Sequence, residues 1–321
     1  MFTDVLSLVL MILFIILGCL YFLYSLFYIK GEKNIKYIIF HSGYSLITIL
    51  FGVSLLFYYP FNSFSFLAIT TYGLTAYTGF ILAYYFRDEK RKKIIFYIFT
   101  GIFTFFTIWK LFSFKELTII QRLPLNVCNI LIIFMIVCSF KKIKFLDNYI
   151  ICFAFLGGLA NFLVGGYYDD IVRTIEEGGL GVLSEGLGFF HERFLEAALL
   201  HSLFLTMCIF TFMSNYIKLD WKKSLLNLIW IAPLFIIFSF TNQIWETDFF
   251  FTGTKGATPS FLISIYNAIP HFEITLFNFN FEINILYSLI LISGCGFVLF
   301  ALTYPLSKIQ DRIYYKEVEQ K

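Results

Sequence analysis

The sequence predicts an all-α fold, a polytopic transmembrane helix bundle with about nine spans. Of the 321 residues, 59% are hydrophobic and only 14% are charged, whereas about a quarter of a soluble domain is charged. The mean hydropathy is +0.80. Apolar stretches of roughly 20 residues, the length that crosses a bilayer as a helix, recur along the whole chain. These observations exclude a sizeable soluble domain, and no nucleic-acid-binding signature accompanies them.

Nine stretches have the length and composition of spans. They lie at about 5–29, 37–59, 63–86, 94–114, 123–140, 147–166, 194–217, 224–245 and 283–306. The first is too long for a signal-peptide core, lacks an early basic cluster and has no small-x-small site after it, so we expect a retained helix. Small residues in "FLGGLANFLVGG", 155–166, predict close helix packing.

Basic residues alternate between the two sides of the predicted bundle. The connections after the first, third, fifth and seventh spans, together with the C-terminal tail, carry 18 of the 24 Lys and Arg residues. Because cytoplasmic loops are enriched in Lys and Arg, we expect an external N-terminus and a cytoplasmic C-terminus in the cell membrane. A reporter fused to the C-terminus is expected to behave as a cytoplasmic protein, and an external reporter would contradict this orientation.

Two longer connections lie on the predicted external side. The first, about 167–193, is acidic and glycine-rich, which fits either a metal or headgroup site or a flexible solvated loop with a short amphipathic helix. The second, about 246–282, contains "HFEITLFNFNFEI", where Phe alternates with Glu and Asn. This alternation predicts a hairpin or an interfacial segment at the level of the lipid headgroups.

Polar side chains from five spans fall at one depth in the outer half of the membrane. Polar groups are costly in lipid, so they usually face the interior of the bundle and mark function. Cys128 lies about five residues into its span and His201 about seven residues into its own, at depths of about 7–10 Å. The other members of this outer layer include Asn161, Asn242 and Tyr72, with Thr70 and Thr71 beside the last.

Cys128 and His201 are the candidate catalytic pair. A helix N-terminus or a neighbouring histidine favours the nucleophilic thiolate, and Pro124 is well placed to open the helix that carries Cys128. Asn126, Asn129 or Asn161 are candidates to orient the imidazole or to donate to an oxyanion. The alternatives are a packed apolar thiol at Cys128, and a histidine that bonds to a backbone carbonyl or to Ser202.

The sequence indicates neither a metal site nor an organic cofactor. The six cysteines all lie in apolar stretches without a CxxC motif or paired loop spacing, which argues against both a disulfide framework and a zinc site. The sequence also lacks the glycine-rich loops of nucleotide-binding proteins and the HExxH motif of zinc-dependent hydrolases.

Four boxes in the chain resemble a known family. These boxes are "LPLNVC" at 123–128, "FAFLGGLANFLVGG" at 153–166, "AALLHSL" at 197–203 and "NQIWETDFFFTGTKGATPSFLIS" at 242–264. Over about 66–306 they resemble the YwaF-type bacterial integral membrane family. That family is similar to a eukaryotic transmembrane acyltransferase of ether phospholipids, of the transmembrane protein 164 type. It is more distantly similar to the androgen-induced membrane hydrolases of fatty-acid esters.

The resemblance implies that Cys128 accepts an acyl group, that His201 is its base, and that Asn242 is a structural or binding group. The family's box histidine is Asn126 here, and Tyr72 stands near the place of its early-helix histidine. The resemblance also implies three parts: two additional N-terminal helices at 1–62, a seven-helix core at 63–306, and a cytoplasmic tail at 307–321.

The expected function is that of a lipid acyltransferase or acyl-ester hydrolase with membrane lipids as substrates. The alternative is a non-catalytic transporter or a protein that binds lipids or small molecules, because polar sites at half depth also bind transported substrates. A helix bundle that docks a partner protein is a third reading. The sequence predicts no oligomeric state.

Overall fold

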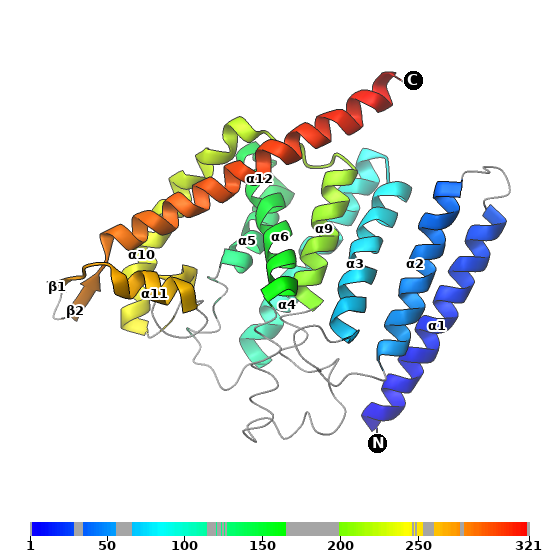
Figure 1. Ribbon diagram of the computed structural model, residues 1–321, viewed down its shortest axis with the longest axis horizontal. Helices are drawn as coiled ribbons and strands as arrows, with labels where there is room; N and C mark the ends of the chain where they lie inside the picture. The colour runs from blue at the N-terminus through cyan, green and yellow to red at the C-terminus, as the bar shows by residue number, and fades with distance from the viewer. Residues whose placement is uncertain are drawn as a thin grey trace. The chain divides into compact units, whose positions relative to one another are not determined.

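The computed structural model describes residues 2–28, 35–55, 66–113, 120, 123, 125, 127–164, 199–245, 247, 249–252, 260–276 and 279–319. Within these ranges the chain is mainly helical (Figure 1), which confirms the predicted all-α class. The elements are α1 Phe2–Tyr28, α2 Ile35–Ser54, α3 Phe66–Tyr85, α4 Glu89–Ser113, α5 Val127–Phe140, α6 Lys144–Val164, α9 His201–Met213, the 3-10 helix η5 Trp221–Asn227, α10 Leu228–Trp245, the 3-10 helix η6 Phe249–Phe251, α11 Ser260–Ala268, β1 Phe272–Leu276, β2 Phe279–Ile283 and α12 Ile285–Glu319.

Each predicted span coincides with a helix of the described residues, namely α1 to α6, α9, α10 and α12. Five segments are long and apolar enough to cross a membrane, by length and composition: Leu8–Phe27, Tyr37–Ser54, Glu89–Phe112, Trp221–Trp245 and Ile285–Ile313. The bundle is therefore a multi-pass membrane protein, and the number of nine spans stays a prediction.

Two helices have ends that differ from the approximate edges of the predicted spans. The fifth span was expected to start at 123, but α5 starts at Val127. The N–H of Leu125, ahead of the helix, donates to the carbonyl of Leu123 at 2.8 Å. Pro124 therefore precedes the helix and is outside the described residues. The last helix was expected to end near 306, but α12 continues to Glu319, because its final turns are rich in good helix formers.

Of the two alternatives predicted for "HFEITLFNFNFEI", a hairpin or an interfacial segment, the structure shows a hairpin. β1 and β2 pair antiparallel with Ile274 opposite Phe281. The alternating Phe and polar residues of β2 give its two faces different chemistry, as expected for a pleated strand. Gln243 of α10 holds this hairpin, because its amide exchanges hydrogen bonds with the backbone of Glu282 at 2.7 and 2.8 Å.

The chain divides into two compact units by contact. Unit 1 contains residues 1–88 and 155–214, and unit 2 contains residues 89–154 and 215–321. The boundary passes through α6, whose first half belongs to unit 2 and whose second half belongs to unit 1. The three parts predicted from the sequence follow membrane topology rather than contact, and they stay a prediction.

Helices of unit 1 approach one another closely at glycines. A Cβ on Gly18 of α1 would stand 2.6 Å from Ile49 of α2, and one on Gly79 of α3 would stand 2.7 Å from the carbonyl oxygen of Thr206 in α9. A Cβ on Gly158 of α6 would stand 2.9 Å from the Cβ of Leu205 in α9. Helices in lipid pack through small residues in this way, and the close packing predicted for "FLGGLANFLVGG" is confirmed at Gly158.

The contact at Gly79 predicts a sensitive position. We expect Gly79→Ala to destabilise the protein by about 1–3 kcal/mol, because the added methyl group must push α3 away from the α9 backbone. Gly101→Ala in α4 is the matched control, since a Cβ there meets no atom within 4 Å and alanine is the better helix former. Thermal unfolding in detergent measures both variants, and equal midpoints would contradict the prediction.

Unit 2 has an aromatic core on α5, α6 and α10. The ring of Trp230 lies 4.4 Å from that of Phe134 and 4.7 Å from that of Tyr149, in both cases edge to face. The indole N–H of Trp230 donates to Asn227 at 3.1 Å, so the polar edge of the ring is satisfied as burial requires. This core fixes the start of α10 against the start of α6.

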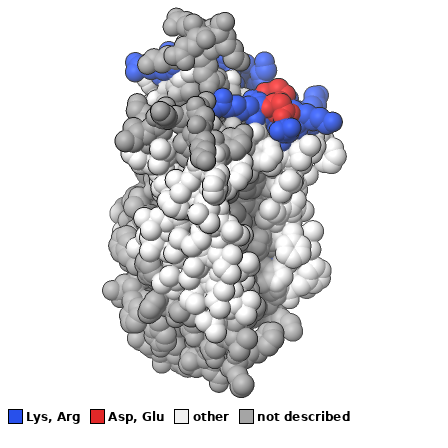
Figure 2. All heavy atoms as spheres, turned by 90° about the vertical axis from the view of Figure 1, so that its right-hand side faces the viewer, with Lys and Arg blue, Asp and Glu red and all other residues white. Residues whose placement is uncertain are grey.

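Charged side chains are confined to one end of the face shown in Figure 2. Lys and Arg gather there with a few carboxylates, and the other described atoms on this face are uncharged. A wide uncharged surface with basic residues at one end is typical of a protein that crosses a membrane. The distribution agrees with the alternation of basic residues along the sequence.

Candidate functional site

His201, the predicted base, is the first residue of α9 and is half-buried. Its ring meets that of Phe204, one turn further on, edge to face at 5.8 Å. On the other side α6 passes so closely that a Cβ on Gly158 would lie 3.0 Å from the carbonyl oxygen of His201. The backbone at His201 is therefore closely packed against α6.

Tyr72 lies close to the level of His201 within unit 1. The hydroxyl of Thr206 donates to the carbonyl of Thr75 at 2.8 Å, and Gly79, further along α3, meets Ile209, further along α9. Residues further along α3 thus meet residues further along α9, so the two helices run parallel. Tyr72 precedes Thr75 by three residues and His201 precedes Thr206 by five, a difference of about 3 Å in height. The register of α3 against α9 thus brings Tyr72 near the height of His201, and the common depth of the other predicted residues stays a prediction.

The side chain of Tyr72 is buried, with 5% of its surface exposed. Its neighbours Thr70 and Thr71 are buried as well, and the hydroxyl of Thr70 lies 2.8 Å from that of Ser54 in α2. α3 thus turns a polar stripe inward rather than toward lipid, as expected for polar groups inside a membrane.

Asn161 lies in α6, three residues or about one helical turn beyond Gly158. Its backbone therefore belongs to the turn of α6 that follows the contact with α9. Its side chain lies outside the described residues, and its predicted orienting role stays a prediction.

Cys128 is the second residue of α5. It lies nearer to the helix N-terminus than the sequence predicted, in the first turn, whose backbone N–H groups have no acceptor within the helix. Asn129 follows it and is buried. The side chain of Cys128 and the whole of Asn126 lie outside the described residues. Cys128 belongs to unit 2 and His201 to unit 1, so their pairing stays a prediction.

Asn242, near the end of α10, is buried and uses all four hydrogen-bonding positions of its amide. Its Nδ2 donates to the carbonyl of Phe249 at 2.8 Å and to the hydroxyl of Thr252 at 2.7 Å. Its Oδ1 accepts from the hydroxyl of Thr247 at 2.7 Å and from the N–H of Phe249 at 3.0 Å. Of the two roles that the resemblance implied, structural or binding, this arrangement favours the structural one.

The loop that Asn242 holds has an unusual backbone. Phe250 has φ 57°, the left-handed region that residues with a Cβ rarely adopt. Its ring is buried against Phe235 and Phe238 of α10, with centroids 5.3 and 5.2 Å away. The amide of Asn242 and this aromatic packing together hold the chain in that conformation.

Sequence reasoning missed a second group of polar residues in unit 2. Asn148 of α6 and Gln310 of α12 are buried, and both bind the backbone of the segment 215–220 that follows α9. An Asn at the start of a predicted span and a Gln in the last helix were available signals. Neither amide was predicted to be functional, because the basic residues nearby were interpreted only as a sign of the orientation in the membrane.

Several apolar helices of spanning length, packed through small residues and polar stripes, define a multi-pass integral membrane protein. A family model described as the TMEM164 family matches residues 59–304, and the chain belongs to this family. The predicted kinship is thereby confirmed, and the match begins after α2. No curated protein and no solved structure matches the chain.

Proposed function

We propose that this protein is a membrane lipid acyltransferase or acyl-ester hydrolase that uses Cys128 as nucleophile and His201 as base. The observation that carries the proposal is the place of Cys128 in the first turn of α5, in a chain of the TMEM164 family. The free N–H groups of a first helical turn favour a thiolate and can also stabilise an oxyanion.

The reaction has two acyl-transfer steps. In the first, the thiolate of Cys128 attacks the ester carbonyl of an acyl lipid, a C–S bond forms and the C–O bond breaks. The departing lyso-lipid oxygen takes a proton from the imidazolium of His201. In the second, the hydroxyl of a lyso-lipid or of water gives its proton to His201 and attacks the thioester, which restores the thiolate.

The rest of the outer layer has supporting roles in this proposal. Asn129 and Asn161 orient the imidazole or bind the oxyanion. Asn126, just before the start of α5, also takes part in orienting the imidazole or binding the oxyanion. Tyr72 on α3 forms one edge of the site. Asn242 acts at a distance, because its amide is occupied by the 247–252 loop.

We further propose a location in the cell membrane with the C-terminus in the cytoplasm. Support comes from the 18 of 24 basic residues on one set of connections and from the gathering of Lys and Arg at one end of the face in Figure 2. The Cys128 end of α5 is then external, and the acyl group is exchanged in the outer half of the bilayer.

Trapping the acyl-enzyme tests the function. The purified full chain in vesicles of phosphatidylcholine with a radiolabelled acyl chain is quenched in acid, and the expected result is label on the protein that neutral hydroxylamine releases. Peptide mapping is expected to place the label at Cys128. Vesicles labelled in the choline headgroup are the matched control and are expected to leave no label on the protein.

The opposite result also decides between functions. A protein that binds the lipid but never carries the acyl label, in conditions where its fold is intact, would contradict the enzyme and favour the non-catalytic binding or transport protein. A hydroxylamine-stable label, or a label on another residue, would contradict the role of Cys128.

A further inference from the structure

The segment 217–220, which follows α9, is held in place by two buried side-chain amides from different helices. Gln310 of α12 donates to the carbonyl of Ile217 at 2.8 Å and accepts from the N–H of Leu219 at 2.9 Å. Asn148 of α6 donates to the carbonyl of Asp220 at 2.6 Å and accepts from its N–H at 3.0 Å. Each amide thus pairs with the backbone as a neighbouring strand would, and the segment 217–220 is fixed between α6 and α12.

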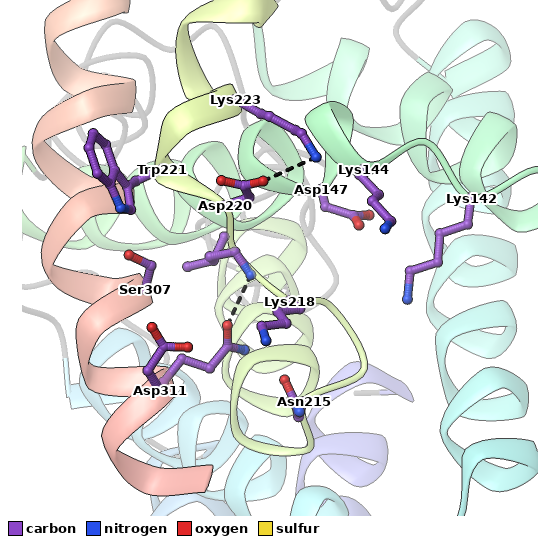
Figure 3. Close-up of a pocket in the computed structure, with 12 residues that line it drawn as sticks. Lys142, Lys144, Asp147, Asn215, Lys218, Asp220, Trp221, Lys223, Ser307 and Asp311 are labelled. Atoms are coloured by element: carbon purple, nitrogen blue, oxygen red, sulfur yellow. Dashed lines mark hydrogen bonds and ion pairs between the residues drawn. The ribbon is translucent and has the colours of Figure 1, made fainter. Parts of the chain in front are cut away.

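This clamped segment forms the floor of a pocket of about 710 Å³. Its walls are the start of α6, the loop before it, η5 and α12, which all belong to unit 2. Figure 3 shows Ser307 and Asp311 on α12 at one side, Lys142 and Lys144 at the other, and Lys218 between them in this view. The pocket lies where three of the basic connections of the chain meet.

Four lysines and three aspartates line the pocket, which leaves a formal charge of +1. One aspartate is already compensated. Asp220 pairs with Lys223 at 3.1 Å and accepts from the N–H of Lys222 at 3.2 Å. Asp147 is 3% exposed and lines the pocket together with Lys142 and Lys144. Lys218 is exposed, and in the described part of the chain it forms no ion pair.

The side chain of Asn215, just before the clamp, adds a polar atom without a partner among the described atoms. Asn215 lines the pocket, has φ 55°, and its buried Oδ1 has no hydrogen-bond partner among the described atoms. A half-turn of this amide presents its NH₂ group at the same point. A ligand with acceptor oxygens would satisfy that donor together with the ammonium group of Lys218.

The rim of the pocket has the chemistry of a membrane interface. Trp221 lies edge to face with Tyr304 at 5.4 Å and with Phe300 at 6.0 Å, and the apolar side chains of Leu225 and Leu226 on η5 are exposed. Trp and Tyr gather at the level of lipid headgroups, and basic pockets between helices at the cytoplasmic side bind phosphorylated headgroups.

We infer that this pocket binds the phosphate group of an anionic phospholipid, with Lys144 and Lys218 as the principal contacts and Asp311 as an opposing charge. The shared chemistry is a terminal phosphate that carries up to two negative charges, which the headgroup of phosphatidic acid or free inorganic phosphate can supply, and the aromatic rim favours the lipid. The site is independent of Cys128 and of the acyl chemistry.

Binding of three probes to the purified full chain in neutral detergent tests the inference. Dioctanoyl phosphatidic acid is expected to bind saturably, and dioctanoyl phosphatidylcholine and inorganic phosphate at least about tenfold more weakly. Lys144→Gln and Lys218→Gln are each expected to weaken binding of the acid about fivefold to tenfold. Asp311→Asn is expected to strengthen it about threefold, because a like charge is removed.

Lys222→Gln is the matched control, because Lys222 carries the same charge beside the pocket but does not line it. It is expected to leave the affinity unchanged, and thermal midpoints show that each variant is folded. An equal loss in Lys222→Gln and Lys218→Gln would overturn the site, as would weaker binding in Asp311→Asn. Inorganic phosphate binding as tightly as the phosphatidic acid would overturn the lipid assignment.

Discussion

Replacing Cys128 by alanine is expected to lower the turnover of an acyl phospholipid by about a thousandfold or more. The variant keeps the helix start, whose N–H groups belong to the backbone, and loses the atom that forms the covalent intermediate. Loss of the nucleophile alone removes most of the rate enhancement in enzymes of this kind. Release of lyso-lipid from vesicles that contain the purified full chain, followed by mass spectrometry, measures the effect.

Cys138→Ala is the matched control for this prediction. Cys138 lies ten residues further along the same helix and is partly buried, so the substitution removes a thiol from α5 without touching its first turn. Its turnover is expected to stay within about twofold of wild type. Wild-type turnover in Cys128→Ala, or an equal loss in Cys138→Ala, would remove Cys128 from the mechanism.

The partnership with His201 is measured by non-additivity. His201→Gln alone is expected to slow turnover by about 10²- to 10⁴-fold, the usual contribution of a general base. The double variant is expected to be no slower than Cys128→Ala, because residues that act as a unit lose their effect together. Multiplied losses would mean that the two side chains act separately.

Hydropathy was sufficient to predict the nine apolar helices, because an apolar helix satisfies its backbone within itself, but it did not predict the short helix α11. Alternation was sufficient for the hairpin of β1 and β2. The exact start of α5 was not predictable from Pro124, since sequence patterns locate a helix better than they locate its ends. The length of α12 was missed because its last turns are polar, and a hydropathy window does not detect polar helix.

The common depth of the candidate site stays a prediction, and the contacts of its members were not predictable from the sequence. The register of α3 against α9 follows from Thr206 and Gly79, and neither residue is remarkable in the sequence. Asn242 was selected as a polar group in an apolar helix, yet its partners are backbone atoms of the next loop. Asn148 and Gln310 show the same limit, because an amide that binds a distant backbone segment leaves no sequence pattern.

Asn242→Ala is expected to lower the free energy of unfolding by about 3 kcal/mol or more. The substitution leaves the N–H and carbonyl of Phe249 and the hydroxyls of Thr247 and Thr252 with fewer partners in a buried place, and each buried unsatisfied group costs about 1–3 kcal/mol. Phe250 then loses the support for its left-handed backbone. We expect the thermal midpoint in detergent to fall by at least about 5 °C.

Gln243→Ala isolates burial as the cause. Gln243 is the next residue and also binds backbone through its amide, to Ser239 and Glu282, but it is exposed, so water replaces the lost bonds. Its variant is expected to lose less than about 1 kcal/mol. Equal losses at the two positions would show that the number of hydrogen bonds, rather than their burial, sets the stability of this end of α10. A large loss at Asn242 alone would show that its amide has a structural role, in which its hydrogen-bonding positions are used to hold the 247–252 loop and not to bind substrate.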